Sequence, residues 1–171
     1  MEDPTSRWRD LVTLLERFST SLDRDSFIVD ALDTLVDLCG AERGLVVLIG
    51  ADGARHVAQA RGHGRALSSA EREEVSRTIL ARAFGSPSVV VWNPLDEAEA
   101  SESLMEMEVT GAMAAALRVP DEALPPQGVI YVDYRDPLRS PTPDDASLLG
   151  AAAGLMSDGL CGVPSMDRAK S

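Results

Sequence analysis

Aromatic residues and cysteines are scarce in this chain of 171 residues. Phe, Trp and Tyr make up 4% of the sequence, so the core must be built from Leu, Val, Ala and Met. Only Cys39 and Cys161 carry thiols, and neither has a second Cys or a His at metal-binding spacing. The sequence therefore supports neither a disulfide framework nor a zinc site. Two isolated thiols suit a reducing compartment, and we expect a cytoplasmic protein.

The sequence also has few basic residues and no long apolar run. The 16 basic residues are outnumbered by 28 acidic ones, which gives a net charge of -12. Such a charge repels phosphate backbones and anionic lipid, so we expect neither nucleic-acid binding nor membrane attachment. No apolar run approaches the roughly 18 residues that span a bilayer. The first five residues carry Glu2 and Asp3, whereas a signal peptide begins with basic residues. The strong preference for Arg over Lys, with abundant Ala and Gly, is typical of a GC-rich bacterial genome.

Catalytic motifs are missing too. There is no GxSxG nucleophile turn, and the glycine-rich stretch at 61–65 lacks the GxGxxG spacing of a phosphate-binding loop. His56 and His63 stand on either side of a turn, and we interpret both as solvated surface residues. The glutamates between 96 and 108 have no helical period and are interpreted as a solvated face. We therefore predict no catalytic residue and no metal ligand.

Two helices are expected before the first strand. The first has an apolar stripe at three- and four-residue steps, formed by Trp8, Leu11, Leu15, Phe18 and Leu22. Its spacing fits a helix packed on the core of its own domain or on the same helix of a second copy. Apolar residues between Ile28 and Cys39 predict the second helix, and Gly40 follows it where a left-handed residue is favoured.

Apolar and small-residue runs predict the strands. Three of them are expected to be buried, at 44–50, 111–119 and 128–134. Asp52-Gly53 predicts a hairpin turn into a more polar return strand at about 55–60, nearer a sheet edge. A further short strand is expected at 89–91.

The connections between these strands differ in kind. A capping-box pattern at 68–71 predicts the start of a helix that Gly85-Ser-Pro87 breaks, and Ser76 is the alternative cap of a shorter helix. The stretches at 61–65 and 96–108 are predicted to be loops. The second is acidic and mobile, with room for a short helix near 101–107.

The last helix is predicted from about 143 to 160. Thr142 is the expected cap, Pro143 takes the first helical position, and Asp145 falls three residues after the cap. Gly150 and Gly154 each cost about 1 kcal/mol relative to Ala in a helix interior. Such a cost suggests that something packs close to this helix.

The order of these elements implies an α+β domain. Short turns between neighbouring strands predict a central antiparallel sheet of five to six strands. The N- and C-terminal helices are expected on one face and a helix and loop flap on the other. With this order the chain resembles the GAF family of sensor domains. The residues that carry the likeness are 39–48, 76–79 with 87–91, 111–120, 128–133 and 142–149. We assign 11–160 to a GAF-like domain, 1–10 to an N-terminal extension or helix start, and 161–171 to a tail or linker.

The resemblance implies a regulatory sensor or dimerisation module of a bacterial signalling or transcription-regulatory protein. It implies a small ligand between the sheet and a flap at about 92–110, with the sheet floor including Ala115. The candidate ligand contacts are Trp92, Met105, Met107, Met113, Tyr131 and Asp133. It also implies a homodimer, with its output domain on the same or a partner chain. The candidate dimer contacts are Leu11, Leu15, Phe18, Leu149 and Met156.

The ligand is not identified by the sequence, and any cofactor is unknown. The Asn-Lys, Phe and Asp-Glu signature of cyclic-nucleotide-binding members is replaced here by Asp133-Tyr134, Pro141 and Asp144-Asp145. The Cys beside a His of the chromophore-binding branch is missing from the flap. One alternative is a ligand-free relic that only dimerises. Another is a redox enzyme of the methionine sulfoxide reductase type, but that activity uses flap-loop cysteines, and Cys39 is expected to be a buried structural thiol.

Overall fold

The structure is a computed structural model that describes residues 9, 24–62, 64–68, 77–93, 109–119, 123–136 and 138–162. Its helices are α2 (Arg24–Cys39), α4 (Arg77–Gly85) and α6 (Pro143–Gly162). Its strands are β1 (Arg43–Ile49), β2 (Arg55–Gly62), β3 (Arg65–Ala66), β4 (Val90–Trp92), β5 (Gly111–Leu117) and β6 (Gly128–Tyr134). The helix expected at 8–22, the capping box at 68–71 and most of the expected flap lie outside the described residues.

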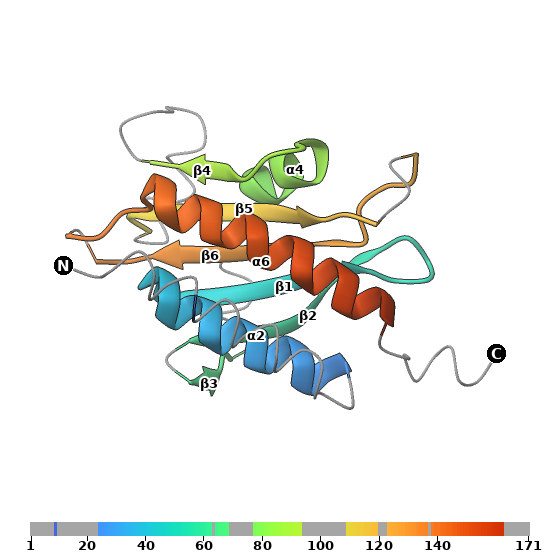
Figure 1. Cartoon of the computed structure of the whole chain (residues 1–171), viewed down its shortest axis with the longest axis horizontal. Helices are drawn as coiled ribbons and strands as arrows, with labels where there is room; N and C mark the ends of the chain where they lie inside the picture. Colours follow the sequence, from blue (N-terminus) through green and yellow to red (C-terminus); the bar gives the residue numbers. More distant parts are fainter. Residues whose placement is uncertain are drawn as a thin grey trace.

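The six strands form one antiparallel sheet in the order β3-β2-β1-β6-β5-β4 (Figure 1). β1 and β6 are the central pair, and β6 bridges the first half of the chain to β5 and β4. The Asp52-Gly53 turn joins β1 to β2 as predicted, with Gly53 at a φ of 81°. The predicted antiparallel α+β architecture is therefore confirmed.

Helices cover both faces of this sheet. α2 and α6 lie side by side across one face, where they share a buried cluster with Val46, Ile130 and Val132 (Figure 1). α4 packs on the opposite face, where Ile79 and Ala83 contact a second buried cluster. Alternate residues of the central strands feed the two clusters, as expected for strands buried on both sides.

Local capping signals set the ends of α2 and α6. Gly40 has a φ of 66°. Its N–H donates to the Asp37 carbonyl, and the Ala41 N–H donates to the Val36 carbonyl, which is the Schellman arrangement. At α6, the Asp145 N–H donates to Thr142 Oγ1 at 3.1 Å, and the Thr142 N–H donates to Asp145 Oδ2 at 3.0 Å. Both predicted helix boundaries are confirmed by these bonds.

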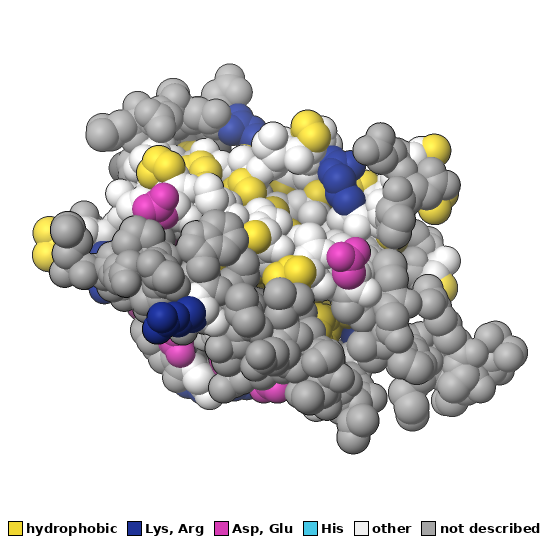
Figure 2. Space-filling view, viewed as in Figure 1, with side chains coloured by type: hydrophobic (Ala, Val, Ile, Leu, Met, Phe, Trp, Pro, Cys, Tyr) yellow, Lys and Arg dark blue, Asp and Glu magenta, His cyan; other side chains and the backbone are white. Residues whose placement is uncertain are grey.

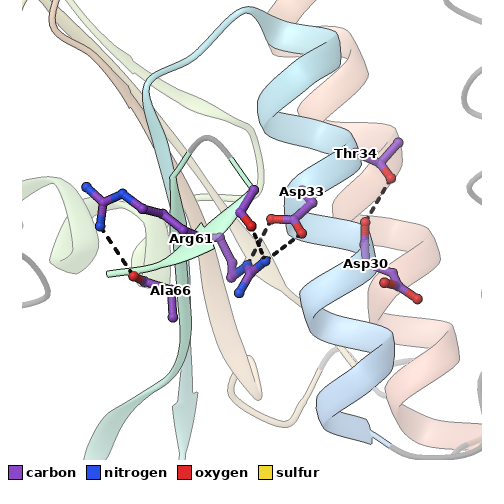
Figure 3. Close-up of polar contacts among 7 residues, drawn as sticks. Asp30, Asp33, Thr34, Arg61 and Ala66 are labelled. Carbon is purple, nitrogen blue, oxygen red and sulfur yellow. Dashed lines mark hydrogen bonds and ion pairs between the residues drawn. The ribbon is translucent and has the colours of Figure 1, made fainter. Parts of the chain in front are cut away.

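The prediction of a loop at 61–65 is wrong. β2 continues to Gly62, and a turn through Gly64 leads to the short edge strand β3. Arg61 stabilises this edge because its guanidinium donates two bonds to Asp33 of α2, both at 2.9 Å, and a third to the Gly64 carbonyl (Figure 3). The hydrogen bond to Asp33 raises the pKa of Arg61. The partner of Arg61 comes from another element, so the local sequence did not reveal it.

Within the described part of the chain, no helix has the length and apolar content needed to cross a bilayer.

Candidate functional site

The sheet face beneath α4 carries a row of side chains that crosses four strands. Trp92 of β4 pairs with Ala112 of β5, which pairs with Asp133 of β6, which pairs with Arg43 of β1. Adjacent strands lie about 4.8 Å apart, so the backbones of Trp92 and Asp133 are separated by about 10 Å. Only the methyl group of Ala112 stands in that interval of the row.

Arg43 and Asp133 form a buried ion pair. Arg43 Nε donates to Asp133 Oδ1 at 3.0 Å and to Oδ2 at 2.9 Å, and Nη2 donates to Oδ2 at 2.6 Å. The side chains are 5% and 0% exposed. A buried charge without a partner is strongly unfavourable, so each member of the pair is needed by the other.

Tyr131 completes this polar group from the adjacent row of the same face. Its hydroxyl donates to Asp133 Oδ2 at 2.9 Å. Burial raises the pKa of Tyr131 well above its usual value, and the negative charge of Asp133 raises it further. Tyr131 is therefore a neutral hydrogen-bond donor at any physiological pH. Arg43, Asp133 and Tyr131 together are called the polar cluster below.

Trp92 lies at the other end of the row with an unmet hydrogen bond. Its side chain is 1% exposed and belongs to the same buried cluster as Tyr131. Its indole Nε1–H has no acceptor among the described residues. A buried donor without a partner is rare in native proteins and calls for a physical explanation.

The carboxylate of Asp133 is fully engaged within the polar cluster. The charges of Arg43 and Asp133 cancel, and both Asp133 oxygens already accept hydrogen bonds. No oxygen of this carboxylate is left without a donor to act as a general base. Among the described residues there is also no group of three or more His, Cys, Asp or Glu that could hold a metal ion.

The structure changes the interpretation of four residues predicted to form the site. Tyr131 and Asp133 do face α4, but Asp133 is engaged by Arg43 rather than available to a ligand. Met113 and Ala115 lie on the opposite face, in the cluster of α2 and α6, so their assignment to the flap-side floor is wrong. The reason is the register, which places Met113 opposite Val132 and one residue out of step with Tyr131.

The predicted dimer contacts on α6 are also wrong. Leu149 and Met156 are 0% and 1% exposed because they pack on the sheet within the chain itself. The other predicted dimer contacts, Leu11, Leu15 and Phe18, lie outside the described residues, as do the ligand candidates Met105 and Met107.

Arg43 was missed by sequence reasoning, although a signal existed. It directly precedes the apolar run at 44–49, and a basic residue there is unexpected in a strand buried on both faces. Its partner is 90 residues away, so only the fold reveals the pair.

Cys39 is buried, as predicted, and it lies in the cluster on the α2 and α6 side of the sheet. The Tyr134 hydroxyl donates to its backbone carbonyl at 3.0 Å. This thiol is therefore on the face opposite α4 and the polar cluster.

No family model and no curated protein sequence matches the chain. Solved structures do match it. A GAF domain from Pseudomonas syringae pv. tomato has a TM-score of 0.66 at 14% identity, with 92% of this chain and 89% of that one covered. The bacteriophytochrome RpBphP3 from R. palustris has a TM-score of 0.73 at 14% identity, with 93% and 37% covered. The cyanobacteriochrome TePixJ GAF domain has a TM-score of 0.63 at 12% identity, with 85% and 93% covered.

Proposed function

Starting from the GAF fold that this chain adopts, we propose that it is a non-catalytic sensory module that binds a small uncharged molecule beneath α4. The observation that carries this proposal is the buried indole N–H of Trp92, which has no acceptor among the described residues. A ligand with a carbonyl, ether or ring-nitrogen acceptor would complete that hydrogen bond.

Electrostatics supports an uncharged ligand. Arg43 and Asp133 neutralise each other, and Tyr131 stays protonated because its pKa is raised. A charged ligand would leave its own charge without a counter-ion among these groups, and burying an unpaired charge is strongly unfavourable.

The strand chemistry supports a flat or compact molecule. Ala112 and Ala114 of β5 lie on this face, and both belong to the cluster of Trp92 and Tyr131. Small side chains on an internal strand, flanked by large aromatic ones, favour a slot between the aromatic groups. Pockets of this kind are mostly apolar with a few fixed polar groups.

Native mass spectrometry of freshly purified protein tests this proposal directly. We expect a retained small molecule, or one captured from a metabolite mixture, that the variant Trp92→Phe no longer retains. In a Trp8→Phe background all indole emission comes from Trp92, so binding should change the intensity or wavelength of that emission. Protein with no retained mass and an unchanged emission across the mixture would favour the ligand-free alternative, in which the face beneath α4 is a filled core.

We propose further that the module works within a larger bacterial signalling or transcription-regulatory protein, as a homodimer with an output domain. The support is by analogy: structures similar to this chain include a phytochrome photosensory core module and a methyl-accepting chemotaxis protein. Since Leu149 and Met156 are buried in the chain's own core, a dimer must use other residues, and the stripe of Leu11, Leu15 and Phe18 is our candidate. Light scattering of the Leu15→Glu variant tests this, because a mass unchanged from that of the parent protein would contradict it.

A further inference from the structure

A concave site lies on the side of the sheet opposite the polar cluster. A groove of about 370 Å³ runs between α6 and residues 86–89, the segment that joins α4 to β4. Ala115 and Ala116 of β5 and the exposed Arg118 also line it. Figure 2 looks onto the face that carries α6 and shows hydrophobic side chains among uncharged white atoms, with a few charged side chains around them.

The wall that α6 contributes is made of small residues one turn apart. Gly150, Ala153, Gly154 and Ser157 line the groove in steps of three and four. A Cβ added at Gly150 would meet the Val89 side chain at 3.1 Å, but one added at Gly154 would meet no atom within 4 Å. Packing within the chain therefore explains why position 150 is glycine. It does not explain glycine at position 154, where Ala would stabilise the helix.

Ser157 provides an independent sign that the groove is occupied. It is 4% exposed, and its Oγ has no hydrogen-bond partner among the described residues. A helical Ser commonly bonds back to the carbonyl four residues earlier, yet this one does not. Ser157 is one of the residues that line the groove, and a molecule bound there could supply the missing partner.

Two side chains of opposite charge line the groove and have few interactions within the described part of the chain. Arg118 donates one bond, to the Ser86 carbonyl at 2.6 Å, and its other N–H groups have no partner in the described part of the chain. The Asp158 carboxylate is exposed. It forms no ion pair with Arg118 or with any other described residue. A groove that offers a cation and an anion, neither paired with the other, is complementary to a molecule that carries both charges.

We propose that this groove binds a small aliphatic zwitterion of amino-acid size. Its carboxylate pairs with Arg118, its ammonium group pairs with Asp158, and one of its polar groups bonds to Ser157 Oγ. The aliphatic part lies on Val89, Ala115 and Ala153, which supply the apolar surface. The volume equals that of about 12 water molecules at about 30 Å³ each, which is enough for such a molecule.

Three matched probes test the proposal: L-leucine, 4-methylpentanoate and 3-methylbutylamine. All three share one aliphatic body. Leucine carries both charges, 4-methylpentanoate carries only the carboxylate, and 3-methylbutylamine carries only the ammonium group. Saturation-transfer NMR on the full chain at millimolar probe should show leucine binding tighter than either half-probe. In the Trp8→Phe background the Trp92 emission should stay unchanged, which separates this site from the one beneath α4.

Charge variants supply the sharpest contrast, because both side chains are exposed and their loss does not threaten the fold. Arg118→Gln should weaken leucine and 4-methylpentanoate by about tenfold or more and leave 3-methylbutylamine unaffected. Asp158→Asn should weaken leucine and 3-methylbutylamine and leave 4-methylpentanoate unaffected. Ser157→Ala should weaken leucine by about threefold to tenfold.

A steric pair completes the design. Gly154→Leu should abolish binding, whereas Ser147→Leu, an exposed position on α6 that does not line the groove, should not. Circular dichroism confirms that each variant is folded. The proposal is overturned if no probe binds, or if leucine binds equally to the parent chain, Arg118→Gln and Gly154→Leu. It is also overturned if Gly154→Leu changes only the oligomeric mass, because the groove would then hold a protein helix.

Discussion

Asp133→Asn is the substitution for which the structure makes the strongest quantitative prediction. It keeps the shape of the side chain but removes the negative charge that Arg43, whose side chain is 5% exposed, pairs with at position 133. Removing one partner of a buried pair destabilises proteins by about 3–5 kcal/mol, because the remaining buried charge loses the compensation that its partner gave. At about 2–4 °C per kcal/mol for a chain of this size, the melting temperature should fall by about 6–20 °C.

Asp33→Asn is the matched control. It disrupts the other bidentate pair, Arg61 with Asp33, whose distances are the same to within a few tenths of an ångström. Those side chains are 17% and 30% exposed, so water can solvate Arg61 when its partner is neutral. We expect a loss of about 1 kcal/mol or less.

Urea unfolding followed by circular dichroism at neutral pH measures both losses. The double variant Arg43→Met with Asp133→Leu should recover much of the stability, since an apolar pair of similar volume often replaces a buried ion pair without loss. Equal losses for Asp133→Asn and Asp33→Asn would refute the reasoning, because burial would then make no difference to the two pairs.

Three further predictions concern single side chains. The raised pKa of Tyr131 contributes stability that is present below pH 10 and is lost as the pH rises above 10, by up to about 1.4 kcal/mol per pH unit. Urea unfolding at alkaline pH should show this loss of stability in the parent chain and a shallower loss in Tyr131→Phe. Gly154→Ala should raise the free energy of unfolding by about 1 kcal/mol, and Gly150→Ala by less because its Cβ meets Val89; the opposite order in thermal melts would contradict this. Thr142→Ala should lower stability by about 1 kcal/mol through loss of the cap, whereas Thr142→Ser should not, as the same melts would show.

Local chemistry made much of the fold predictable. Gly40 after an amphipathic run, Asp52-Gly53 between two strands, and Thr142 three residues before Asp145 each specify a backbone conformation through groups a few residues apart. Such signals depend on steric and hydrogen-bonding rules that act within one or two turns. The loop expected at 61–65 failed because a distant carboxylate, Asp33, holds Arg61 in the strand.

The candidate site was predictable only in part, because faces of a strand are decided by register. β5 consists of small and apolar residues on both faces, so it has no polar alternation to show which residues point toward α4. A shift of one residue exchanges the two faces, and this is why Met113 was placed with Tyr131 when it lies with α2 and α6.

By itself the sequence determined the element order, the helix ends and the class of fold, because these follow from local periodicity and capping. Only the tertiary structure decided that Arg43 neutralises Asp133, that Leu149 and Met156 face inward, and that Ser157 lines a groove. Those facts depend on contacts between residues far apart in the chain, whose pairing is fixed by strand register and helix packing rather than by neighbouring residues.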